Sequence, residues 1–145
     1  MEKVIDNFLK YVQIDTESEE GSMTFPSTQK QHELAKVLAG QLQEMGAEEI
    51  TYDMKHCYVY ASIPASKGCE SSPVVGFIAH MDTAASFSGK DVKPQVIPEY
   101  NGQDVVLPGN GDVIKVSDFP HLLTLKGRTL ITTDGTTLLG ADDKA

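Results

Sequence analysis

The sequence predicts an α/β fold in which a mixed, mainly parallel sheet is flanked by helices. Two observations indicate this class. Residues 73–79 (PVVGFIA) are apolar without alternation, which is typical of a strand covered on both faces. Two segments of helical periodicity, residues 2–12 and 28–45, precede this run, and we expect both to pack on the sheet. A chain of 145 residues can bury the core of one domain.

Both helices are predicted from apolar residues that recur on one helical face. In residues 2–12 these are Val4, Ile5, Phe8, Leu9 and Val12. In the second helix they are Leu34, Val37, Leu38, Leu42 and Met45. Thr28 and Gln31 have the spacing of a capping box, and Gly46 fits a helix end. The residues between the two helices are rich in Ser, Glu and Gly and predict a loop.

The strands are predicted from short apolar runs separated by turn residues. Residues 49–54 and 58–63 read as a hairpin, with Pro64 ending its second strand. Residues 65–72 form a polar linker before the buried strand at 73–79, and residues 84–128 are irregular, with four prolines. Residues 129–133 and 136–139 flank Asp134-Gly135, a strong hairpin signal.

Charge and hydropathy exclude several classes of partner. The net charge of −9, from 12 basic and 21 acidic residues, disfavours nucleic acid and anionic membranes as partners. No apolar run approaches the roughly 18 residues of a membrane span. Residues 1–6 lack the apolar core of a signal peptide. We therefore expect a cytoplasmic protein without membrane or nucleic-acid partners.

His80 and Asp82 follow the apolar run directly and are the first candidate site residues. Ligands in α/β sheets bind beyond the carboxyl ends of strands, and side chains two residues apart in a strand point the same way. The imidazole and the carboxylate can therefore converge on one metal ion. The alternative is structural: His80 caps a backbone carbonyl and Asp82 begins a turn. The motif by itself does not decide between them.

A second motif, Ala141-Asp142-Asp143-Lys144, follows about sixty residues later, and the combination of the two motifs favours metal binding over the structural alternative. With both motifs, the chain resembles the peptidase T branch, the tripeptide aminopeptidases, of the di-zinc metallopeptidase family. That family also contains carboxypeptidase G, dipeptidases and deacylases. Residues 130–145 are the most specific part of the resemblance. The other matching segments are residues 8–12, 14–16, 76–84 and 87–90. His56-Cys57 replaces the Asn-Gly turn usual in peptidase T.

The resemblance implies a zinc-exopeptidase fold and a role for each motif residue. His80 would bind one of two zinc ions, Asp142 would bridge both, and Asp82 would be the catalytic-site residue that orients the His80 ring. We expect the side chains of His80 and Asp142 to approach within about 5 Å. Asp143 would be a helix N-cap or a loop hydrogen-bonder, and Lys144 would neutralise the acidic cluster.

The resemblance also implies that residues 1–145 are the N-terminal part of a truncated catalytic domain. The rest of that domain and a lid or dimerisation domain would be absent. The glutamate that acts as general base would also be absent. The same holds for three metal ligands, namely a glutamate, an aspartate and a distal histidine. The parent would be a zinc-dependent aminopeptidase that releases the N-terminal residue of tripeptides by metal-activated water attack. We expect a small peptide substrate, a possible homo-oligomer of the parent, and no activity from the fragment.

Two alternative functions stay open. Another hydrolase of the same family, a dipeptidase or an N-acyl amino-acid deacylase, would use the same motifs. A non-catalytic binding fragment would explain a chain that lacks the downstream ligands. Other candidate side chains have weaker patterns: Cys57 and Cys69 fit no zinc spacing, and Glu19-Glu20 and Glu48-Glu49 read as surface charge. His32 and His121 belong to no motif and read as surface histidines.

Overall fold

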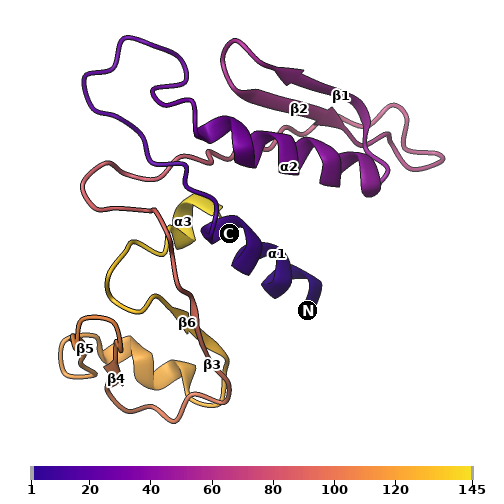
Figure 1. The fold of residues 1–145 in the computed structure, drawn as a ribbon. Helices are drawn as coiled ribbons and strands as arrows, with labels where there is room; N and C mark the ends of the chain where they lie inside the picture. Colours follow the sequence, from indigo (N-terminus) through magenta and orange to yellow (C-terminus); the bar gives the residue numbers. More distant parts are fainter. Residues whose placement is uncertain (1, 145) are drawn as a thin grey trace. The chain divides into compact units, whose positions relative to one another are not determined.

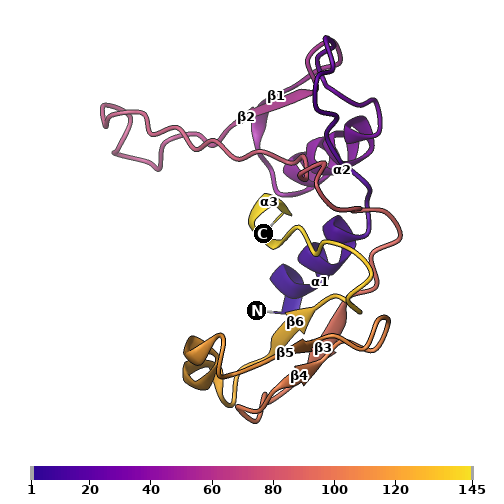
Figure 2. The same ribbon diagram turned by 90° about the vertical axis from the view of Figure 1, so that its left-hand side faces the viewer.

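The structure is a computed structural model that describes residues 2–144, with only the backbone of Glu2. Within this range the contacts divide the chain into two compact units, residues 2–15 with 86–143 and residues 16–85 with Lys144. Helices and strands occur in both units (Figures 1 and 2). The α/β class predicted from the sequence is therefore confirmed.

The unit of residues 16–85 is built from one helix and one hairpin. Helix α2 (Gln31–Glu44) lies along the antiparallel strands β1 (Glu48–Asp53) and β2 (Tyr58–Ser62), as Figure 1 shows. Leu34 and Ala35 are buried on the inner face of the helix. The predicted helix and the predicted hairpin are confirmed, because both depend on local periodicity.

The start of α2 differs in detail from the predicted capping box. The N-cap residue is Lys30, which has helical backbone angles and makes no side-chain cap. Gln31 and Thr28 do interact, since Gln31 Nε2 donates to Thr28 Oγ1 at 3.3 Å. The Thr28 hydroxyl instead donates to the carbonyl of Glu17 at 2.7 Å. Met45, expected to face inward, is exposed at the C-cap.

A four-residue turn of residues 54–57 joins the strands of the hairpin. Asp53 Oδ1 accepts hydrogen bonds from the backbone N–H groups of Lys55 and His56, at 2.9 and 3.2 Å. Cys57 closes the turn with φ of +60°, in the left-handed region. Its side chain is buried, and this burial raises the pKa of the thiol. The residues that replace an Asn-Gly turn thus still form a tight reversal.

The prediction that residues 73–79 form a buried central strand is wrong for this structure. The segment is neither strand nor helix, and the side chains of Val74, Phe77 and Ile78 are at least 95% exposed. A strand of this composition requires hydrogen-bonding neighbours and covering layers on both faces. Residues 2–144 supply neither to this segment.

The other unit contains helix α1 (Glu2–Val12) and two short sheets. Strand β3 (Gln95–Ile97) pairs antiparallel with β6 (Leu130–Thr132), and β4 (Val105–Val106) pairs antiparallel with β5 (Val113–Ile114). The 3₁₀ helix η1 (Pro120–Leu125) follows β5. Tyr100, Val105 and Leu122 form the buried centre of this unit. Residues 84–128 are thus more regular than the sequence indicated.

The predicted hairpin around Asp134-Gly135 is also wrong in its second strand. β6 pairs with β3, about 35 residues earlier in the chain, and residues 136–139 form no strand. The sheets seen in the described residues are antiparallel pairs, and one isolated parallel bridge joins Glu17 to Thr83. Among these residues no helix has the length and apolar character required to cross a bilayer.

Candidate metal-binding motifs

His80 and Asp82, the residues of the first motif, contact each other. His80 Nδ1 lies 3.2 Å from Asp82 Oδ1 and 3.1 Å from the backbone oxygen of Asp82. Both partners are acceptors, so the proton of the neutral ring is assigned to Nδ1. In that tautomer Nε2 carries the lone pair that can bind a metal. Both side chains are partly exposed, at 62% for His80 and 43% for Asp82.

The residues after His80 are held by a distant segment that the sequence analysis did not assign to the site. Thr16 Oγ1 donates to the carbonyl of Met81 at 2.7 Å, and Thr83 N–H donates to the carbonyl of Thr16 at 3.1 Å. Ser18 N–H then donates to the carbonyl of Thr83 at 2.8 Å. Thr16 and Thr83 are fully buried. No periodicity indicates such a pairing, since 65 residues separate its two sides.

Asp142 and Asp143 occupy the first turn of the short helix α3 (Ala141–Lys144). Asp142 is exposed, and Asp143 is half-buried. Asp143, expected as a helix N-cap or a loop hydrogen-bonder, is instead the third residue of this helix, where negative charge is favourable. The exposed Asp142 carboxylate is accessible for a ligand.

The turn that leads to α3 is fixed to the loop of residues 107–112. Gly109 N–H donates to the carbonyl of Asp134 at 2.7 Å, and Asn110 Nδ2 donates to the carbonyl of Gly135 at 2.8 Å. The packing is close: a Cβ atom on Gly109 would lie 2.6 Å from Asp134 Cγ, and one on Gly135 would lie 2.2 Å from Asn110 Oδ1. Larger residues at these two glycines would separate the turn from the loop.

The Asp134 carboxylate stabilises this turn from within. Its Oδ1 accepts hydrogen bonds from the hydroxyl and the N–H of Thr136, at 2.6 and 2.9 Å, and Lys93 Nζ lies 3.5 Å from Oδ2. The hydroxyl of Thr136 is the main cause that lowers the pKa of Asp134 below its ordinary 3.8, with Lys93 contributing. The ionised form is therefore the one that the folded turn binds.

This lowered pKa predicts a pH dependence of stability. Above pH 3.8 the ionised Asp134 should make its full contribution to the free energy of unfolding, and this contribution should fall as the pH drops below 3.8. The reason is that the unfolded chain binds the proton first. Asp134→Asn should flatten the pH dependence, because the amide oxygen can accept the same bonds without titrating. Urea unfolding from about pH 6 to pH 3 measures both proteins. Parallel curves for the two would contradict the assignment.

The two motifs belong to different units of the chain. His80 and Asp82 lie in the unit of residues 16–85, and Asp142 lies in the unit of residues 86–143. The expected approach of the His80 and Asp142 side chains therefore stays a prediction. Within residues 2–144, no group of three or more His, Cys, Asp or Glu side chains could hold a metal ion.

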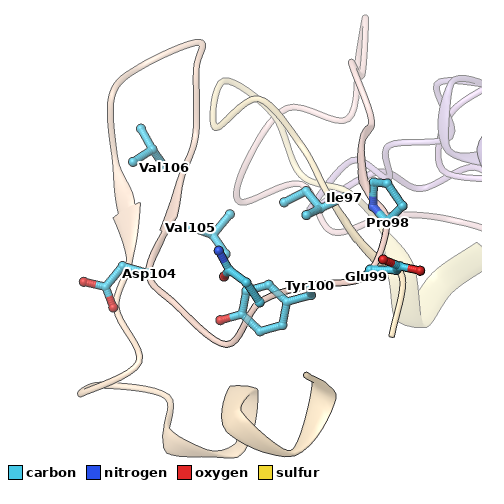
Figure 3. A pocket seen from close by; sticks show the side chains of 8 residues that line it. Ile97, Pro98, Glu99, Tyr100, Asp104, Val105 and Val106 are labelled. Atoms are coloured by element: carbon cyan, nitrogen blue, oxygen red, sulfur yellow. The ribbon is translucent and has the colours of Figure 1, made fainter. Parts of the chain in front are cut away.

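A shallow hollow of about 270 Å³ lies in the unit of residues 86–143, and no motif residue lines it. Figure 3 shows the Tyr100 ring beside Val105, with the carboxylates of Glu99 and Asp104 on opposite sides. The residues that line it are Ile97, Pro98, Glu99, Tyr100, Asn101, Asp104, Val105 and Val106. None of them is a predicted metal ligand, so the hollow is not the candidate metal site.

No protein-family model matches the chain. Comparison with curated proteins does find relatives that match it over its whole length. The chain is 50% identical to a Peptidase T of Alkaliphilus oremlandii and 53% identical to one of Clostridium novyi, each over 100% of its residues. It is 52% identical to a Peptidase T of Brevibacillus brevis over 99% of its residues.

The chain spans about 35% of the length of these relatives, with shares of 36%, 35% and 35%. Half of its residues are identical to theirs along this length, so the likeness extends well beyond the short His80-Asp82 and Asp142-Asp143 motifs. Over its whole length the chain is therefore similar to proteins named Peptidase T.

Proposed function

We propose that this chain is the N-terminal part of the catalytic domain of a zinc-dependent tripeptide aminopeptidase. The observation that carries the proposal is the identity of about half of all residues to proteins named Peptidase T. The complete protein would release the N-terminal residue of tripeptides in the cytoplasm. A dipeptidase or deacylase activity is less well supported, because the compared relatives that match the whole chain carry the name Peptidase T.

The donor chemistry of the two motifs fits part of a zinc site. Imidazole nitrogen and carboxylate oxygen are both zinc ligands, and a catalytic zinc takes about three protein ligands. His80 would hold one ion through Nε2, and Asp142 would bridge two ions. A bound metal pair supplies Lewis-acid activation of water and of the peptide carbonyl. The remaining ligands and the general base would come from residues that follow in the longer protein.

The roles of the chain's own residues follow from their contacts. With the ring proton on Nδ1, the carboxylate and the backbone carbonyl of Asp82 both accept a hydrogen bond from His80 Nδ1–H. In the Nδ1–H tautomer this contact would leave the Nε2 lone pair for the metal ion and would orient the ring. Asp82 would thus act on the reaction by orienting a ligand. Asp142, at the exposed start of α3, would place a carboxylate beside both ions.

The mainly parallel sheet expected from the family would form in the complete protein. Two observations support this. The bridge between Glu17 and Thr83 is parallel, and the apolar side chains of residues 74–78 are exposed in the present chain. Burying such side chains is favourable by roughly 1.5–3 kcal/mol each. Neighbouring strands of the longer protein would thus pair with residues 74–78, so slow amide hydrogen exchange is expected there and fast exchange in residues 1–145 alone.

The test of the proposed function is an Asp82→Asn variant of the full-length protein. Asparagine has nearly the same shape, but its neutral amide oxygen accepts the Nδ1–H hydrogen bond more weakly than a carboxylate does. We expect tripeptide turnover to fall about 10–100-fold while most of the zinc stays bound, as for other residues that orient a metal ligand. The assay is release of the N-terminal residue from a tripeptide, with zinc titrated into chelator-stripped protein.

The chain offers a matched control for this variant. Asp53 forms the same kind of pair with His56, whose Nδ1 lies 2.7 Å from Asp53 Oδ2 in the hairpin turn. Asp53→Asn should leave turnover unchanged. A dipeptide and an N-acyl amino acid serve as the competing substrates. Faster cleavage of either one than of the tripeptide would replace the proposed substrate class by the corresponding alternative.

A further inference from the structure

The segment of residues 16–18 lies against residues 81–83, next to the proposed metal ligand. The side-chain hydroxyl and the backbone carbonyl of Thr16 bond on the two sides of Asp82. Thr16 Oγ1 donates to the carbonyl of Met81 at 2.7 Å, and the carbonyl of Thr16 accepts from Thr83 N–H at 3.1 Å. These bonds hold the two peptide groups that flank Asp82. This pairing restrains the backbone of Asp82 and, with it, the direction of its Cα–Cβ bond.

One of these two peptide groups also contacts the histidine. The Asp82–Thr83 peptide donates its N–H to Thr16, and its carbonyl oxygen, that of Asp82, lies 3.1 Å from His80 Nδ1. A shift of this peptide would move both acceptors of the His80 ring, since the Asp82 carboxylate is attached to the same residue. A displacement of Thr16 would therefore shift both hydrogen-bond acceptors of the His80 imidazole through Asp82 alone.

The segment of residues 16–18 is itself anchored. Thr28 Oγ1 donates to the carbonyl of Glu17 at 2.7 Å, and Lys30 Nζ lies 3.1 Å from Glu17 Oε2. Both anchors lie just before helix α2. Ser18 adds two bonds to the carbonyl of Thr83, from its N–H at 2.8 Å and from its hydroxyl at 3.0 Å. The segment thus links the motif to a regular element within one unit of the chain.

Burial strengthens these contacts. Thr16 is 0% exposed and Thr83 1% exposed, whereas His80 is largely exposed. Water cannot replace a hydrogen bond of a fully buried hydroxyl, so loss of the Thr16 hydroxyl would leave the Met81 carbonyl without this donor. Displacements of about 1 Å at a reacting site can cost about 10²-fold in rate.

We infer that Thr16 and Ser18 are positioning residues for the proposed metal site, which fix Asp82 and through it the His80 ring. The inference rests on the proposed function for the identity of the metal. It assigns a role in the site to the loop that follows α1.

The experiment compares Thr16→Val and Thr16→Ser in the full-length protein. Valine keeps the volume and removes the hydroxyl, whereas serine keeps the hydroxyl. We expect Thr16→Val to lower kcat about 10-fold, to lower kcat more than it raises KM, and to weaken zinc binding measurably but no more than Asp82→Asn does, because Thr16 acts through Asp82. Thr16→Ser should restore most of both. Zinc affinity is measured by competition with a chromogenic chelator, and thermal unfolding of the metal-free proteins is followed in parallel.

Two further variants complete the design. Thr124→Val removes a hydroxyl bond of the same kind, from Thr124 Oγ1 to the carbonyl of His121 at 2.7 Å, and should leave zinc affinity unchanged. Ser18→Ala removes one of two bonds to Thr83 and should lower zinc affinity only a few-fold, about as one weak contact does. This variant tests the inference even if Thr16→Val fails to fold.

The outcomes separate this inference from the proposed function. A Thr16→Val protein that unfolds at lower temperature but keeps wild-type zinc affinity and kcat would show a structural role alone and overturn the inference. The same follows if the wild-type protein binds no zinc. A wild-type protein that binds zinc without cleaving tripeptides would overturn the proposed function. In that case the zinc affinities of the variants still decide the role of Thr16.

Discussion

His80→Ala and Asp142→Ala are each expected to abolish zinc binding and tripeptide hydrolysis together in the full-length protein. The imidazole of His80 and the carboxylate of Asp142 are the two direct ligands that this chain would supply. A catalytic zinc takes only about three protein ligands, so the loss of one removes a large share of its affinity. Metal content after dialysis and tripeptide turnover are measured on the same samples.

Exposed residues of the same types serve as controls for these two substitutions. His121, in η1, and Asp118 are both exposed and lie outside the two motifs. His121→Ala and Asp118→Ala should retain full zinc content and turnover. If His80→Ala keeps its zinc and its activity, the metal assignment of the His80-Asp82 motif is wrong and the structural alternative, a histidine that caps a carbonyl, holds.

Residues 1–145 by themselves are expected to show no tripeptide hydrolysis at zinc concentrations that saturate the full-length protein. In the proposed site the chain would offer two direct ligands, short of the roughly three required. It would also lack the general base, whose proton transfer is typically worth about 10²–10⁴-fold in rate. The assay is the same zinc titration, run side by side on both proteins. Robust turnover by residues 1–145 would show that the site is complete and its ligands misassigned.

Amide hydrogen exchange is measured on the same two proteins, residues 1–145 and the full-length protein. Fast exchange at residues 74–78 in the short protein and slow exchange in the full-length protein would connect inactivity with the missing strand neighbours. Equal protection in both proteins would mean that residues 1–145 already hold this segment in a sheet, against the exposure that the structure shows.

Elements that depend on local patterns were predicted well from the sequence. Helices α1 and α2 follow the spacing of their apolar residues, and the β1–β2 hairpin follows two strand-like runs around a four-residue turn. A local pattern can specify such elements because their hydrogen-bonding partners are near in the chain. The candidate site residues were proposed from local patterns too, since His80-x-Asp82 and Asp142-Asp143 are short motifs, and their roles stay predictions.

Elements whose partners are distant were predicted poorly. Asp134-Gly135 has the composition of a hairpin turn, yet β6 pairs with β3, and Gly135 packs against Asn110 instead. In residues 73–79 the apolar pattern indicates a buried strand, but the described residues do not cover it. A periodic pattern shows that a segment can be buried, and only the neighbouring residues decide whether it is.

The sequence by itself determined the two helices, the first hairpin, the two motifs and the family that the motifs indicate. Only the tertiary structure showed that Thr16 bonds on both sides of Asp82, and that Asp82 contacts His80 through two oxygens. The physical reason is the range of the interaction. A motif consists of residues close together in the sequence and can be found there. The orientation of its side chains depends on hydrogen bonds between segments 65 residues apart, which leave no periodic signal in the chain.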